Sequence, residues 1–274
     1  MPGEQVKGIN LDIRKGEIFG IGGLAGQGKL GIPNGIMGLY KAQGQVLING
    51  EPLNLDKLGS ALEHKIAFVS EDRKGVGLLL NESIEHNIIF SAMQTNNKFL
   101  KRVLWMRLYD KKAAREHAQE MVKRLDIRCT GIRQAAGRLS GGNQQKVLLA
   151  KWMFTEPDVL ILDEPTAGLD PKERIIFRNL IASLSQDCIV LLSTHIVSDI
   201  ETIADDIIVM KEGKILLHDT PQELLQTMQN KVWQVSLPKK EALALINSFI
   251  IVKSHNIGDC IELRIVADTS PHPQ

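Results

Sequence analysis

Residues 159–170 read VLILDEPTAGLD, in which a short apolar run ends in an Asp–Glu pair and continues into a glycine-containing turn. A brief apolar run that stops at charged residues is typical of a strand buried on both faces of a sheet. Similar runs predict strands at residues 17–21, 65–69, 188–192 and 206–210. Stretches with helical spacing separate these runs, for example residues 114–125. Strands that alternate with helices predict an α/β fold with a mainly parallel sheet.

Two parts of the chain depart from this alternation. Residues from about 81 to 155 contain no convincing strand pattern, so we expect a helical subdomain inserted into the α/β core. After Pro221, two alternating segments and one segment with helical spacing follow, at residues 231–237, 260–266 and 239–247. We therefore expect a core domain over residues 1–221 and a small α+β accessory region over residues 222–274.

Composition excludes several classes of protein. The net charge of +1 gives no bias toward nucleic acid or an anionic membrane surface. The 3 cysteines are far apart and form no CxxC pair, which argues against a disulfide framework or a zinc module. No apolar run approaches the roughly 20 residues that a membrane-spanning helix needs, and the first residues lack the pattern of a signal peptide. If this protein serves a membrane, we expect it to do so from the side rather than by spanning it.

A glycine-rich loop follows the first predicted strand. The phosphate-binding pattern is GxxxxGK followed by Ser or Thr, and both of its glycines and its lysine are present here. The candidate binding residues of this loop are Gly23, Gly26, Gly28, Lys29, Leu30 and Gly31. Glycines let backbone N–H groups turn toward phosphate oxygens, and the lysine adds a full positive charge. The loop therefore predicts phosphate binding.

The loop also departs from that pattern. Leu30 stands where a hydroxyl would ligate Mg²⁺, and a leucine side chain has no oxygen to offer. If the following helix opens near Gly28, Pro33 removes the N–H that would bond the carbonyl of Lys29, and we expect a kink there. A glycine-rich turn between a strand and a helix also fits a dinucleotide-binding site or a purely structural turn, so this loop alone leaves the function open.

Three further motifs decide between these readings. Residues 139–146 read LSGGNQQK, residues 159–166 read VLILDEPT, and residues 192–195 read LSTH. Together with the loop, and in this order, they resemble the ATP-binding domain of ABC transporters over residues 8–221. The resemblance implies a P-loop NTPase core, binding of ATP and Mg²⁺, and ATP hydrolysis.

Residue type suggests a role for each motif. Asp163, at the end of a buried strand, would deliver a carboxylate to Mg²⁺ or its water shell, and Glu164 beside it would accept a proton from the attacking water. His195, at the end of another strand, would hold the γ-phosphate and that water. As isolated residues, such groups are more often solvated strand ends or hydrogen-bonded surface residues, and it is their combination that favours catalysis.

The resemblance also implies partners. Ser140, Gly141 and Gly142 are expected at a helix start, where free N–H groups suit a phosphate. In the family these residues complete the ATP site of a second nucleotide-binding domain, so two such domains meet head to tail, as a homodimer or a heterodimer, with Asp170 at the junction. An integral membrane permease is the expected third component, and no nucleic acid is expected.

Two branches of the family are represented. Residues up to about 165, including VSEDRK at 69–74, resemble the second ATPase half of sugar-import ABC proteins, whereas residues from about 167 resemble ATPase subunits of ABC-2-type exporters. Glu71 occupies a place where most ABC domains have glutamine. Import and export both remain open, as do a natural mosaic and an engineered join.

One rival function is an ABC domain that binds ATP but hydrolyses it weakly or not at all, in a regulatory role. Leu30, Glu71 and Pro33 favour it, while Glu164 and His195 oppose it. A soluble ABC protein that acts on nucleic acid or ribosomes is disfavoured, because such proteins usually carry tandem domains, zinc modules or long coiled coils.

Overall fold

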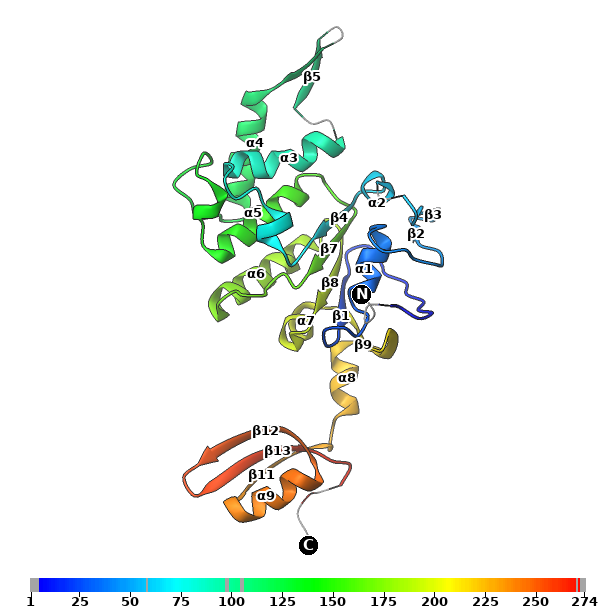
Figure 1. Cartoon of the computed structure of the whole chain (residues 1–274), viewed down its shortest axis with the longest axis vertical. Helices are drawn as coiled ribbons and strands as arrows, with labels where there is room; N and C mark the ends of the chain where they lie inside the picture. The colour runs from blue at the N-terminus through cyan, green and yellow to red at the C-terminus, as the bar shows by residue number, and fades with distance from the viewer. Residues whose placement is uncertain (1–4, 58, 97–98, 104–105, 270, 272–274) are drawn as a thin grey trace. The chain divides into compact units, whose positions relative to one another are not determined.

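The computed structural model describes residues 5–57, 59–96, 99–103, 106–269 and 271. The chain divides into two compact units, Met1–Asp219 and Thr220–Gln274. Each unit has a sheet of its own (Figure 1). Within the described residues, no helix is both long enough and apolar enough to cross a membrane.

A six-stranded sheet forms the centre of the first unit, with the order β10-β9-β1-β8-β7-β4. Its strands are β1 (Ile18–Gly22), β4 (Ile66–Val69), β7 (Val159–Asp163), β8 (Ile189–Thr194), β9 (Asp206–Lys211) and β10 (Lys214–Asp219). All pairings are parallel except that of β10 with β9, which is antiparallel. The predicted α/β fold with a mainly parallel sheet is confirmed, and each predicted core strand is present.

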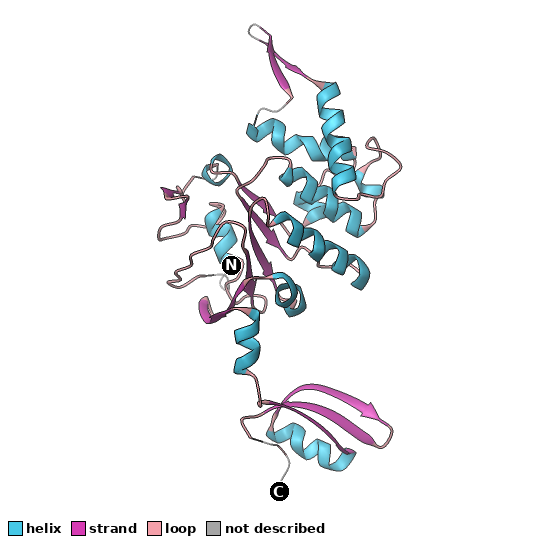
Figure 2. Cartoon of the chain, turned by 180° about the vertical axis from the view of Figure 1, so that it is seen from behind, coloured by secondary structure: helices cyan, strands magenta, loops and turns pink. Residues whose placement is uncertain are grey.

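Helices cover both faces of this sheet. The helices beside it are α1 (Gly31–Ile36), α2 (Ser60–Glu63), α6 (Pro171–Leu184) and α7 (Val197–Ile203), and a small hairpin of β2 (Leu47–Ile48) and β3 (Glu51–Pro52) lies near α2. Phe19 and Ile21 on β1 join one buried cluster with Ile32 of α1 and Ala61 of α2. Figure 2 shows α6 and α7 on the opposite side of the sheet from α1.

The glycines of β1 allow α7 to lie close against the strand. A Cβ atom at Gly20 would lie 3.1 Å from side-chain atoms of Ile200 on α7, and one at Gly22 would lie 3.0 Å from the same side chain. These distances are tighter than an ordinary van der Waals contact. The glycine spacing that resembles a dinucleotide-binding turn is therefore accounted for by helix packing.

The inserted subdomain is mainly helical, as expected, and consists of α3 (Ile84–Asn96), α4 (Lys111–Arg124) and α5 (Gly141–Met153). The prediction that this stretch contains no strand is wrong, because β5 (Leu100–Val103) and β6 (Met106–Tyr109) pair as an antiparallel hairpin. Each of these strands has 4 residues and pairs only with the other. Cross-strand pairing stabilises so short a ladder, and a pattern along one segment does not reveal it.

The second unit is a three-stranded antiparallel sheet with a helix packed on one face. Its elements are α8 (Pro221–Thr227), β11 (Val232–Pro238), α9 (Lys239–Ser248), β12 (Ile250–Ile257) and β13 (Cys260–Val266), and the sheet order is β11-β13-β12. Val235, Ala242, Leu263 and Ile265 form its core. The sequence did not predict β12, because a register shift between Ile251 and Lys253 breaks its alternation.

Candidate functional site

The glycine-rich loop leaves β1 in a conformation that only glycine adopts easily. Gly28 has a φ of +98°, and a Cβ atom there would lie 2.8 Å from the Cα of Gly213 in the turn between β9 and β10. The backbone N–H of Gly213 donates to the carbonyl of Gln27 at 2.9 Å. The same turn donates the N–H of Glu212 to the Gln27 side chain at 2.8 Å. The shape of the loop is therefore fixed by contacts with a neighbouring turn.

Helix α1 begins at Gly31 rather than near Gly28, and Leu30 is its N-cap residue. Pro33 therefore lies in the first turn, where a missing N–H costs no helical bond. Asn34 donates the first bond, from its N–H to the carbonyl of Leu30 at 3.1 Å. The condition for the predicted kink at Pro33 is not met. The Leu30 side chain brings no oxygen to this position.

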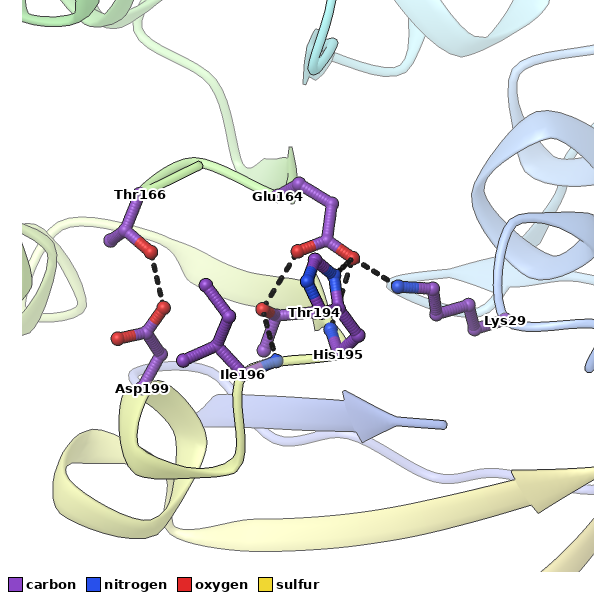
Figure 3. Close-up of polar contacts among 7 residues, drawn as sticks. All are labelled: Lys29, Glu164, Thr166, Thr194, His195, Ile196 and Asp199. Atoms are coloured by element: carbon purple, nitrogen blue, oxygen red, sulfur yellow. Dashed lines mark hydrogen bonds and ion pairs between the residues drawn. The ribbon is translucent and has the colours of Figure 1, made fainter. Parts of the chain in front are cut away.

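Lys29, Glu164 and His195 come together in one cluster, in which Lys29 and Glu164 are buried and the side chain of His195 is exposed (Figure 3). The Nζ of Lys29 donates to Oε1 of Glu164, and both side chains are only 4% exposed. The backbone N–H of His195 donates to the same oxygen at 3.0 Å, and its Nδ1 lies 2.7 Å away. Thr194 donates its hydroxyl to Oε2 of Glu164 at 2.9 Å.

The sheet order explains this convergence. β1, β8 and β7 are adjacent and parallel, so the loops that follow them leave the same edge of the sheet. Lys29 follows β1, Glu164 follows β7, and His195 follows β8. The carboxyl ends of parallel strands are where open α/β sheets place their ligands. Three segments far apart in the sequence thus supply one site.

The backbone also positions Glu164. Its φ of +45° lies in the left-handed region, which a non-glycine residue adopts only where its surroundings require it. Its N–H donates to the carbonyl of Ser193 on β8 at 2.8 Å. Strained backbone of this kind is concentrated at functional sites.

The pKa values of the two adjacent carboxyl groups are shifted in opposite directions. Burial alone would raise the pKa of Glu164, but hydrogen bonds from Lys29, His195 and Thr194 outweigh it and lower the pKa overall. The pKa of Asp163 is instead raised to about 6, by burial first and by the negative charge of Glu164 second. Both carboxyl groups are therefore mainly ionised at neutral pH, and Asp163 is the first of the two to take up a proton as the pH falls.

Asp163 has unsatisfied bonding capacity. Its side chain is 5% exposed, and its Oδ1 has no hydrogen-bond partner among the described atoms. A favourable interaction with the backbone N–H of Glu71 offsets part of the rise in the pKa of Asp163. Glu71 itself is exposed, and its charge adds to the negative potential at Asp163. A buried carboxylate oxygen without a partner is a place for a cation.

Asp163 and its surroundings suit a metal ion whose other ligands come from a bound phosphate group. Nowhere in the described ranges do 3 or more His, Cys, Asp or Glu side chains form a group that could hold a metal. Mg²⁺ is commonly bound through one or two carboxylates, with substrate phosphates and water as its other ligands. Asp163 fits that arrangement, whereas Leu30 does not contribute to it.

The remaining predicted residues form a second group. Ser140 is the N-cap of α5, and its hydroxyl accepts a hydrogen bond from the side chain of Asn143 at 2.9 Å. Gly141 and Gly142 are the first residues of α5, and Asp170 caps α6 by accepting from the N–H of Glu173 at 3.0 Å. In the part of the chain that the structure describes, no hydrogen bond or ion pair joins this group to Lys29, Glu164 or His195.

Sequence reasoning missed three polar residues near the site. The hydroxyl of Thr194 donates to Glu164 and also accepts a hydrogen bond from the backbone N–H of Ile196 at 3.0 Å. Thr166 and Asp199 are fully buried and hydrogen-bonded to each other, so they tie the loop after β7 to the start of α7 (Figure 3). Their positions beside the DEPT and STH motifs were the available signal, but the contacts depend on the fold.

Comparison with known proteins gives consistent results. A family model described as "ABC transporter" matches residues 6–167. The chain is 36% identical over 220 residues to a xylose import ATP-binding protein of Thermoanaerobacter pseudethanolicus, which covers 78% of this chain and 42% of that protein. It is 37% identical over 216 residues to a ribose import ATP-binding protein of Clostridium perfringens, with coverage of 77% and 42%. The chain thus spans less than half the length of these curated relatives.

Solved structures share the fold. Part of an ABC transporter complex from Clostridium perfringens superposes with a TM-score of 0.68 at 26% identity, covering 89% of this chain and 88% of that one. A bacterial ABC transporter cassette, solved as a dimer, superposes with a TM-score of 0.65 at 26% identity, covering 79% and 90%.

Proposed function

The chain belongs to the ABC transporter family, and on that premise we propose that it binds and hydrolyses ATP to drive transport through a separate membrane permease. The observation that carries the proposal is the convergence of Lys29, Glu164 and His195 at the end of the parallel sheet. The names of the relatives support import rather than export, and a sugar is the substrate class they suggest. Substrate selection would then lie in the permease. We place the chain on the cytoplasmic face of the membrane.

The site residues suggest a mechanism. Lys29 and the backbone amides of the loop bind the β- and γ-phosphates, so the phosphates must replace Glu164 as the partner of Lys29. Glu164 is then free to accept a proton from the attacking water. His195, which is bonded to Glu164, is placed to hold that water and the γ-phosphate. Mg²⁺, held through Asp163, would supply positive charge to the phosphates.

Assembly with a second cassette is part of the proposal. Within the described residues, no hydrogen bond or ion pair joins the Lys29–Glu164 cluster to the second group of predicted residues. That group, Ser140, Gly141, Gly142 and Asp170, is available to complete the site of another cassette. The dimeric structure of a related cassette supports this arrangement. The second cassette is either a copy of this chain or a different one.

We further propose that hydrolysis is slow. Leu30 offers no oxygen to Mg²⁺, so Asp163 must hold the metal with little help from the protein. We expect turnover below the 1–100 s⁻¹ that is typical of kinases, which catalyse a related phosphoryl transfer. The alternative function, ATP binding without hydrolysis in a regulatory role, rests on the same residue together with Glu71.

A steady-state phosphate-release assay tests the proposal, with Glu164→Gln as the matched control. We expect measurable release from the wild-type chain and none from the variant, which should still bind ATP and accumulate as a dimer in sedimentation. ATP binding without release from the wild type would favour the regulatory alternative. Absence of ATP binding would overturn both functions.

A further inference from the structure

The turn that follows β4 contributes no residue to the catalytic cluster, although its sequence is distinctive. A π-helical turn spans Arg73–Gly77, and the Asp72 carboxylate caps it by accepting from the N–H of Gly75 at 2.8 Å. The carbonyl of Asp72 also accepts from the N–H of Gly77 at 2.9 Å. A Cβ atom at Gly75 would lie 2.3 Å from the Asp72 carboxylate, so a side chain there would disrupt the cap. The turn is therefore held by its own hydrogen bonds.

The turn is also docked on α5. Lys151 of α5 donates from Nζ to the carbonyl of Gly77 at 2.9 Å. A Cβ atom at Gly77 would lie 3.1 Å from Leu148 of α5, so the turn touches the helix at that point. These contacts fix the backbone from which the Arg73 side chain extends.

Arg73 reaches from this turn to two other segments. Its Nη1 donates to the carbonyl of Gly141 at 3.4 Å. Its Nη2 would lie 3.3 Å from a Cβ atom at Gly141 and 3.6 Å from one at Gly168. The guanidinium thus lies between the start of α5 and the loop after β7, and the absence of a side chain at Gly141 leaves room for it.

Helix electrostatics alone does not explain the placement of this cation. The start of a helix is its positive end, so a positive side chain beside it is unfavourable. The described residues include no carboxylate within ion-pair distance of Arg73. The carboxylate of Glu173 lies beside the next residue of the helix, 2.6 Å from where a Cβ atom at Gly142 would be. An arginine kept here at an electrostatic cost suits a surface that an anion approaches.

We propose that Arg73 is a positioning residue that locks the start of α5 to the loop after β7, so that both present one rigid, positively charged face to the nucleotide of a second cassette. The part that concerns the second cassette rests on the proposed function. The locking itself lies within one chain.

Hydrogen–deuterium exchange of the nucleotide-free chain tests the locking. Arg73→Met keeps an apolar stem but removes the fork of donors, and Lys74→Met is the matched control, because Lys74 is an exposed cation on the same turn. We expect amides of residues 139–142 and 168–170 to exchange roughly tenfold faster in Arg73→Met, a change comparable to loss of one hydrogen bond to a charged group. Exchange in Lys74→Met and in the sheet of both variants should match the wild type. Unchanged exchange at both segments in Arg73→Met, or faster exchange throughout the chain, would overturn the proposal.

Sedimentation in the Glu164→Gln background tests the consequence for assembly. Arg73→Met should weaken ATP-driven dimerisation at least tenfold without changing the affinity of the monomer for ATP, while Lys74→Met should change neither. Arg73→Lys keeps the charge but not the forked geometry, so it should fall between wild type and Arg73→Met. Normal dimerisation of Arg73→Met would refute a role in the shared face. If the Glu164→Gln parent itself stays monomeric, the proposed homodimer fails, and the exchange experiment alone decides the role of Arg73.

Discussion

Replacing Lys29 by methionine should destabilise the nucleotide-free protein, although this residue is expected to serve nucleotide binding. In the structure, Nζ of Lys29 donates a hydrogen bond to the carboxylate of Glu164, and each of the two side chains is 4% exposed. Methionine retains most of the apolar stem, so the change removes mainly the charge and the hydrogen bond. It leaves Glu164 as a buried carboxylate with one donor fewer.

The contacts that Glu164 keeps in the Lys29→Met variant limit the loss of stability. Removing one partner of a buried ion pair typically costs about 3–5 kcal/mol when the other charge is left uncompensated. Glu164 keeps the hydroxyl of Thr194 and two contacts with His195, so we expect a smaller loss of about 2–3 kcal/mol in the free energy of unfolding. For a domain of this size, that loss corresponds to a fall in Tm of roughly 5–10 °C.

Thermal and urea unfolding of a double-mutant cycle provide the assay. Glu164→Gln removes the charge that Lys29 balances, so the double variant should be more stable than the sum of the two single changes predicts. The difference between wild type and Lys29→Met should shrink as pH falls through the lowered pKa of Glu164, because its protonation removes the pair. Equal Tm values for wild type and Lys29→Met at neutral pH, without nucleotide, would refute the reasoning.

Other predictions concern the metal, the buried aspartate and the second unit. Leu30→Ser should restore an oxygen ligand and raise both the phosphate-release rate and its dependence on Mg²⁺; a folded variant with neither change would implicate Glu71 instead. Because the pKa of Asp163 is raised to about 6, the folded protein takes up a proton between about pH 6 and pH 4, so its stability should rise as pH falls through that window. Asp163→Asn should abolish this dependence and raise the urea midpoint at pH 7, and an unchanged midpoint would contradict it. Deleting residues 222–274 should leave ATP affinity nearly intact by calorimetry, and a large loss in a folded truncation would show that the domain boundary is misplaced.

The sequence predicted best what depends on local pattern. Five of the six core strands were recognisable as buried apolar runs between charged or glycine residues, as in β7 and β1, where every residue is buried. The sixth, β10, was not predicted, because most of its residues are exposed. Helix α4 was equally clear, since Ala114, Ala118 and Met121 line one face at helical spacing. Short motifs identified Glu164 and His195 as candidates, because their residue types and their order along the chain are specific.

What the sequence did not reveal depends on contacts between distant segments. The hairpin β5–β6 and the strand β12 are held by neighbours, and their own patterns are short or interrupted. The loop motif predicted that Lys29 would face a phosphate, but not that it would pair with Glu164. The hydrogen bond of Arg73 to Gly141 and its position beside Gly168 bring three segments together, and no spacing along the chain encodes this arrangement.

The close approach of α7 to β1 has a consequence for interpreting variants. His195 is followed at once by α7, and the position of α7 depends on Ile200 resting against the bare backbone of Gly20 and Gly22. A methyl group added at Gly20, inside the sheet, would push α7 outward and carry His195 with it. Such a substitution would present in an assay as a catalytic defect although it touches no reacting group. The interior of the sheet thus sets the position of a residue at its edge.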